Sequence, residues 1–176
     1  MTTGSGAEGR RRLIIMRHAK AEPFASSDHD RVLTARGHRD AEEAGQWARQ
    51  SGLGVDHAVV SSAARTRGTW ASFSAGAELD LEPVIDRSLY GAGTDGALEI
   101  IGSAPDEAAS VLLIGHNPTM AYLVHLLDDG GADTELFSRV SAGFPTSALA
   151  VLDVPCAWSD LDVGGARITG FHVGRG

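Results

Sequence analysis

The sequence predicts an α/β domain whose strands are mostly parallel and covered by helices on both faces. Three segments repeat one pattern, in which an apolar run leads into a polar cluster and then a helix-like stretch. The apolar runs do not alternate with polar residues, which is typical of strands buried on both faces. These runs are LIIMRH (13–18), HAVVSS (57–62) and SVLLIGH (110–116).

The helix expected after the first run covers residues 34–52. Its small residues recur at steps of four, three and four, which places them on one packed face. These residues are Gly37, Ala41, Ala44 and Ala48. The second run leads into a helix-like stretch over 63–77.

The third helix is expected over 117–131, where both ends carry recognisable signals. Asn117 is a suitable N-cap and Pro118 suits the first helical turn. Gly130 and Gly131 supply the stop. The buried stripe between them is Met120, Leu123, Val124 and Leu127.

The remaining segments are less regular. Residues 83–89 and 95–104 form a weaker strand and helix unit of the same kind. Residues 129–147 are expected to be loop with some helix, and residues 129–146 could fold over a site. Residues 148–154 and 166–173 resemble two further strands.

Composition predicts one domain over 13–176, preceded by a flexible tail at 1–12. With 176 residues of which 43% are apolar, the chain can form one well-buried core. The single cysteine, Cys156, excludes an internal disulfide and fits a reducing cytosol. The tail's arginines precede too short an apolar run for a signal peptide, and no run approaches the length of a membrane span. A cytoplasmic protein is therefore expected.

The net charge of −8 argues against a nucleic-acid surface, so any anion site must be a local concentration of cations. Arg17 and His18 end the first strand, Arg65 follows the second, and His116 ends the third. In an open α/β sheet, the loops that leave the carboxyl ends of the strands line the binding crevice. These four side chains are therefore expected to converge, and a phosphate is the anion that they would meet.

Four motifs in this order resemble the histidine phosphatase superfamily, and within it the short SixA-type phosphohistidine phosphatases. The motifs are LIIMRHAKAE, DRVLTARGH, VVSSAARTRGT and VLLIGHNP. The resemblance is clear over residues 13–128, although Ala19 stands where the family usually has glycine and Ser62 where proline is common. It implies a three-layer α/β/α sandwich, no metal, no cofactor, and transfer through a phosphorylated histidine.

Carried over by position, the resemblance makes His18 the nucleophile that accepts the phosphoryl group. Arg17, Arg65 and His116 would hold the phosphoryl oxygens. Arginine forks match phosphate geometry and remain charged. His18 must attack as neutral imidazole, and the neighbouring arginines would lower its pKa. His116 would donate a hydrogen bond or a charge to the transferring group.

The general acid of the family has no clear counterpart. Relatives that cleave phosphate esters usually have a glutamate after the third strand, and Asp86 is the nearest candidate here. Expelling an alkoxide needs a proton donor, whereas exchanging one P–N bond for another needs it less. The sequence therefore favours phosphohistidine, presented on a phosphorelay protein, as the substrate. Two alternatives remain, namely a phosphatase for small phosphate esters and a phosphate-binding module without turnover.

Other polar features receive structural interpretations. Asp28, Asp30 and Arg31 are expected to form a structural ion pair, with a role in loop geometry or substrate contact as the alternative. The GAGTDG segment at 91–96 matches a dinucleotide fingerprint but lies too late in the fold. The remaining histidines lack metal-ligand spacing, so no metal site is expected.

Overall fold

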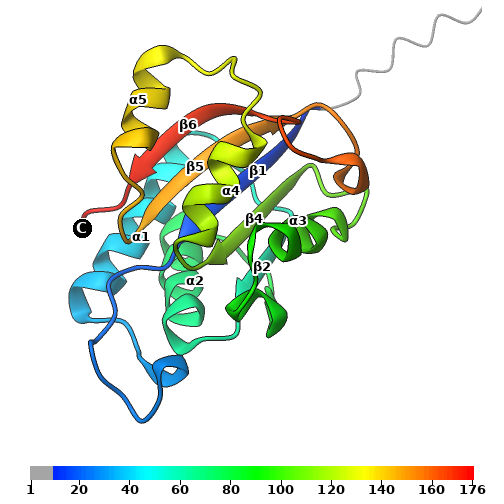
Figure 1. The fold of residues 1–176 in the computed structure, drawn as a ribbon. Helices are drawn as coiled ribbons and strands as arrows, with labels where there is room; N and C mark the ends of the chain where they lie inside the picture. Colours follow the sequence, from blue (N-terminus) through cyan, green and yellow to red (C-terminus); the bar gives the residue numbers. More distant parts are fainter. Residues whose placement is uncertain (1–9) are drawn as a thin grey trace, which may run out of the picture.

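The computed structural model describes residues 10–176 and confirms the α/β prediction (Figure 1). Over these residues the chain forms six strands and five α-helices. In chain order the elements are β1 (Arg11–Arg17), α1 (Ala35–Gln50), β2 (His57–Ser61), α2 (Ala64–Ala77), β3 (Val84–Asp86), α3 (Thr94–Gly102), β4 (Ser110–Gly115), α4 (Thr119–Leu127), α5 (Thr134–Ala142), β5 (Ala148–Val154) and β6 (Arg167–Val173). Short 3-10 turns lie at η1 (Asp28–Asp30), η2 (Ser88–Tyr90) and η3 (Trp158–Asp160).

The first strand begins two residues earlier than the tail boundary that the sequence suggested. Arg12 pairs with Ser110 on β4 and with Asp153 on β5. Arg11 also belongs to β1, and its guanidinium donates to the Cys156 carbonyl at 3.0 Å. Long polar side chains can occupy the first positions of a strand when their charged tips reach the surface. The remaining tail prediction concerns residues 1–9, which lie outside the described residues.

The six strands form one sheet in the order β3-β2-β4-β1-β5-β6. β1 pairs in parallel with β4, β4 with β2, and β2 with β3. β5 runs antiparallel to both β1 and β6, so it alone opposes the others. The sheet is therefore mostly parallel, as predicted.

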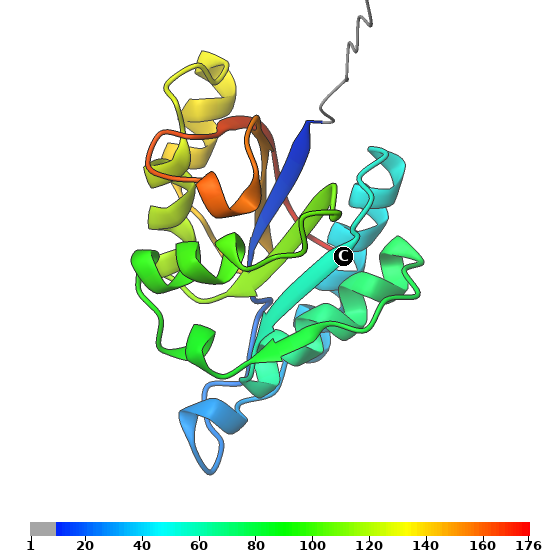
Figure 2. The same cartoon turned by 90° about the vertical axis from the view of Figure 1, so that its right-hand side faces the viewer.

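Helices cover both faces of the sheet, which makes the three layers visible in Figure 2. On one face, Ile14 and Ile114 pack with Phe73 of α2 and with the alanines of α1. On the other face, Leu13 and Leu113 pack with residues of α3, α4 and α5. Neighbouring residues along β1 thus enter opposite cores, which explains the continuous apolar run.

Two helical glycines allow α1 and α2 to pack closely. A Cβ on Gly76 would lie 2.0 Å from the Glu42 carbonyl oxygen, and one on Gly45 would lie 2.1 Å from the Phe73 oxygen. We expect Gly76→Ala to lower the free energy of unfolding by about 1–3 kcal/mol or more, because the helices must move apart. Gly102→Ala is the control, since its Cβ would meet only ordinary contacts, the nearest at 3.5 Å. Urea unfolding measures both, and equal midpoints for the two variants would contradict this account of the helix pair.

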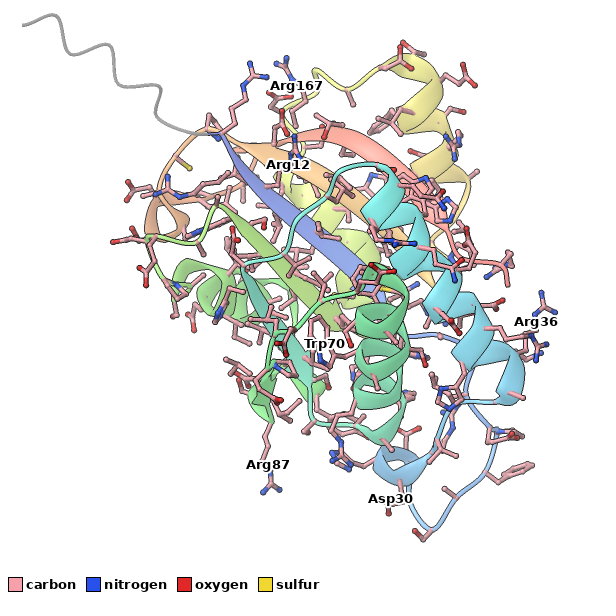
Figure 3. All side chains as sticks on the ribbon, turned by 180° about the vertical axis from the view of Figure 1, so that it is seen from behind. Arg12, Asp30, Arg36, Trp70, Arg87 and Arg167 are labelled. Atoms are coloured by element: carbon pink, nitrogen blue, oxygen red, sulfur yellow. The ribbon has the colours of Figure 1, made fainter. Side chains whose placement is uncertain are left out.

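The carboxyl ends of β1, β2 and β4 lie together at one end of the molecule. The β1–α1 connection, which carries η1, extends beyond this end (Figures 1 and 2). Figure 3 places Asp30 there, opposite Arg12 and Arg167.

α4 begins at Thr119 rather than at 117, and Asn117 Oδ1 accepts from the Ala121 amide at 3.3 Å. Between residues 10 and 176, no helix has the length and apolar character needed to cross a membrane.

Candidate active site

The structure brings the four predicted side chains to the carboxyl end of the sheet. His18 directly follows β1, and its amide donates to the carbonyl of Gly115, the last residue of β4, at 3.0 Å. His116 follows β4, so the two imidazole rings lie 5.4 Å apart between centroids. Arg65 is the second residue of α2, at the helix start that follows β2. Arg17 and Arg65 both lie close enough to His18 for their charges to lower its pKa.

His18 has the form that a nucleophile needs. Its Nδ1 lies 2.7 Å from the Ala19 carbonyl oxygen, an acceptor, so Nδ1 carries the proton and Nε2 keeps a lone pair. Burial lowers the pKa of His18 to about 4, and the charges of Arg65, Arg17 and Arg31 act in the same direction. The ring is therefore neutral near pH 7, as the sequence analysis expected.

Arg17 is held by the segment that follows α5. Its Nη1 donates to the Phe144 carbonyl at 3.2 Å, and Asn117 Nδ2 donates to the same oxygen at 2.8 Å. Burial lowers the pKa of Arg17, but an arginine remains charged at neutral pH. The segment 129–147, expected to be loop with some helix, thus contributes a backbone carbonyl that positions Arg17 and Asn117.

Arg65 is buried and uses both of its terminal nitrogens on one residue. Nη1 donates to the Asp28 carbonyl at 2.8 Å and Nη2 to the Asp28 carboxylate at 3.1 Å. Thr69 joins this helix to the backbone beside His18, because its hydroxyl donates to the Arg65 carbonyl and accepts from the Ala19 amide. Arg65 is only 6% exposed, so its orientation is closely determined.

His116 pairs with a buried serine that the sequence analysis did not single out. Its Nε2 lies 2.7 Å from Ser61 Oγ. Burial lowers the pKa of His116 to about 3, and the charge of Arg65 acts in the same direction. His116 is therefore neutral near pH 7, so it can donate a hydrogen bond but not a charge. That role requires the Ser61 hydroxyl to donate to Nε2, which leaves the proton on Nδ1.

Three polar atoms of this site are buried without a hydrogen-bond partner. They are Arg17 Nε, Arg65 Nε and His116 Nδ1, and among the described residues Ser147 Oγ is the fourth such atom. Leaving a buried donor unpaired costs about 1–3 kcal/mol, and more when it is charged. Unpaired donors beside a neutral imidazole are suited to binding an oxyanion. Residues 10–176 contain no cluster of side chains suited to a metal ion.

Asp86 does not fit the role of general acid. Its Oδ1 accepts from the amides of Ser88 and Leu89 and from the Ser88 hydroxyl. The hydrogen bonds from Ser88 are the main reason that the pKa of Asp86 is lowered, so the group is ionised at neutral pH. Its side chain makes an Asx turn at the start of η2, so the structure does not support the candidate that the sequence suggested.

The predicted ion pair at Asp28 is present but has a second partner. Asp28 binds Arg31 at 2.9 Å, as expected, and also binds Arg65. Asp30 instead accepts from the hydroxyls of Ser26 and Ser27, at 2.9 and 2.7 Å. The contact of Asp28 with a site residue was not predicted.

The neutral histidines contribute to stability in a pH-dependent way. The pKa of His18 is about 4 in the folded protein against 6.5 ordinarily, so between these values the unfolded chain binds more protons. Stability should fall as the pH falls through this window, by about 3 kcal/mol from His18. We expect urea unfolding of His18→Gln to depend less on pH between 7 and 4 than that of the wild type. Parallel curves would contradict the buried, neutral assignment.

The fold and the sequence are both similar to those of known phosphatases. The family model for the histidine phosphatase superfamily (branch 1) matches residues 13–90. The chain is 35% identical to a candidate phosphohistidine phosphatase SixA from Nakamurella multipartitia, whose structure superposes with a TM-score of 0.83 over 94% of this chain and 97% of that one. A SixA homolog from Haemophilus influenzae is 31% identical over 122 residues, which are 64% of this chain and 74% of the relative.

An uncharacterized protein of Mycobacterium tuberculosis is 40% identical over 162 residues, which are 91% of this chain and all of the relative. The chain belongs to the histidine phosphatase superfamily, and it is a phosphatase.

Proposed function

We propose that this protein is a phosphohistidine phosphatase that acts through a phosphorylated His18 on a phosphorelay protein. One observation carries the proposal. Three buried donors that lack hydrogen-bond partners lie beside a neutral imidazole whose Nε2 is available. Similarity to SixA-type phosphatases supports the same substrate class. The single, free Cys156 is compatible with a cytoplasmic location for this reaction.

In the first step, His18 Nε2 attacks the phosphorus of the substrate phosphohistidine. A new P–N bond forms as the bond to the substrate's imidazole breaks, and the departing nitrogen keeps the electron pair and takes a proton from solvent. The donors of Arg17, Arg65 and His116 offset the charge that spreads over the equatorial oxygens. In the second step, water attacks the phosphorus, the bond to Nε2 breaks, and inorganic phosphate leaves.

The carboxylates of the site support a phosphoramidate over an ester. The pKa of Asp28 is lowered by hydrogen bonds from Tyr90 and Arg31, and that of Asp86 by Ser88, so neither holds a proton at neutral pH. An alkoxide leaving group would depend on such a proton. An imidazole leaving group depends on it less, because the bond broken and the bond formed are alike.

The surface beside the site fits a substrate presented on another protein. A shallow, open surface lined by Arg17, Arg139, Phe144 and Phe171 adjoins the phosphoryl site and shares Arg17 with it. An apolar surface with a few charged groups is suited to the residues that flank a phosphorylated side chain. This surface would also favour a folded protein over a small ester.

The test compares a phosphohistidine peptide with an aryl phosphate, followed by an alkaline quench and a search for acid-labile phosphate on His18. Turnover of the peptide with label on His18 supports the proposal. Efficient turnover of the ester, with the peptide untouched, would replace it with a monoesterase. Binding of inorganic phosphate without any turnover would indicate a phosphate-binding module.

A further inference from the structure

Asp28 joins the β1–α1 connection to the phosphoryl site. Its Oδ2 accepts from Arg65 Nη2 at 3.1 Å and from the Tyr90 hydroxyl at 2.6 Å, while Oδ1 accepts from Arg31 Nη1 at 2.9 Å. The Asp28 carbonyl accepts from Arg65 Nη1 at 2.8 Å. Three elements of distant sequence, namely η1, α2 and η2, therefore meet at one residue.

The two bonds to Arg65 determine how its guanidinium lies. A planar fork held at both terminal nitrogens has little freedom to rotate. Of its three other N–H groups, the one on Nε is buried and has no partner. The arrangement therefore uses one hydrogen on each terminal nitrogen for orientation and leaves Nε for a ligand oxygen.

Tyr90 extends the same connection to His116. The Arg65 guanidinium carbon lies 5.9 Å from the centre of the Tyr90 ring, and that ring meets His116 edge-to-face at 5.5 Å. Because the Tyr90 hydroxyl donates to Asp28, the carboxylate fixes the ring that packs between these two site residues. Asp28 is thus connected to two of the three residues that would hold a phosphoryl group.

We propose that Asp28 is a positioning residue for phosphoryl transfer, which orients Arg65 directly and His116 through Tyr90. This inference rests on the proposed function. A carboxylate near an oxyanion site opposes anion binding through its charge. Its benefit must therefore appear in the transition state, where oriented donors matter most, and not in affinity for the ground state.

Asp28→Asn tests the role, with Asp30→Asn as the matched control. An asparagine has one side-chain acceptor oxygen, which cannot serve Arg65, Arg31 and Tyr90 together. We expect kcat on the phosphohistidine peptide to fall about tenfold or more, which corresponds to about 1.4 kcal/mol. The Kd for inorganic phosphate, measured by calorimetry, should stay unchanged or become lower. Asp30→Asn should change neither value, because Asp30 bonds to the exposed hydroxyls of Ser26 and Ser27 and pairs with the partly exposed His29 at 3.9 Å, not with Arg65.

A purely structural role would give a different pattern. It would lower the melting temperature and reduce kcat and phosphate affinity together, and either that result or an unchanged kcat would overturn the proposal. If Asp28→Asn fails to fold, Tyr90→Phe removes one of the same hydrogen bonds and should lower kcat by a smaller factor at unchanged phosphate affinity. If the wild type cleaves only the aryl phosphate, the proposed substrate fails, and the same comparison is made on that ester.

Discussion

Replacing His18 with asparagine should reduce turnover of a phosphohistidine peptide by about 10⁴-fold or more, because the atom that forms the covalent bond to phosphorus is lost. Asparagine keeps a side-chain amide that can donate to the Ala19 carbonyl, as Nδ1 of His18 does at 2.7 Å. The change therefore removes Nε2 while disturbing the buried backbone little. Single-turnover assays and alkaline gels for phosphorylated protein measure the loss.

The control for this variant is His125→Asn, an exposed position on α4. It should retain both turnover and labelling. His18→Asn itself should still bind inorganic phosphate, since the donors of Arg17, Arg65 and His116 remain. Normal turnover in His18→Asn, or label on His116 in the wild type, would show that the nucleophile has been misassigned.

The local pattern of apolar and polar residues was sufficient to predict the principal strands and helices. The run at 13–16 is apolar throughout because alternate side chains enter two separate cores. The strand order was not predictable in the same way, since pairing β1 with both β4 and β5 depends on contacts between residues distant in sequence. The tail boundary was misplaced because the charges of Arg11 and Arg12 obscured their positions in β1.

The parallel strands and the family resemblance together predicted where the four side chains of the site lie in the chain. Arg17, His18 and His116 stand at strand ends, and Arg65 stands at a helix start. The groups that support them carried weaker signals. The Phe144 carbonyl belongs to the backbone and has no signature in sequence, and Tyr90 reaches the site only through the folding of η2. Ser61 was visible at the end of its strand, but its hydrogen bond to His116 was not.

Arg65→Lys preserves the charge of the site and tests whether the shape of the guanidinium matters. The arginine holds Asp28 with Nη1 and Nη2, at 2.8 and 3.1 Å, and keeps a buried Nε without a partner. A lysine has one ammonium group, so it either remains on the carboxylate or reaches the phosphoryl oxygens. We expect kcat/KM to fall about 10²–10³-fold, the usual cost of removing an oriented donor from a transition state.

Arg87→Lys is the matched control for this substitution. Arg87 is exposed at the same end of the molecule (Figure 3) and should tolerate lysine without loss of activity. Phosphate affinity of Arg65→Lys should fall much less than kcat/KM, because the charge survives while the oriented donor does not. If Arg65→Lys kept kcat/KM within about threefold of the wild type, charge alone would account for phosphoryl binding. The two hydrogen bonds to Asp28 would then stabilise the β1–α1 connection and would not contribute to the reaction.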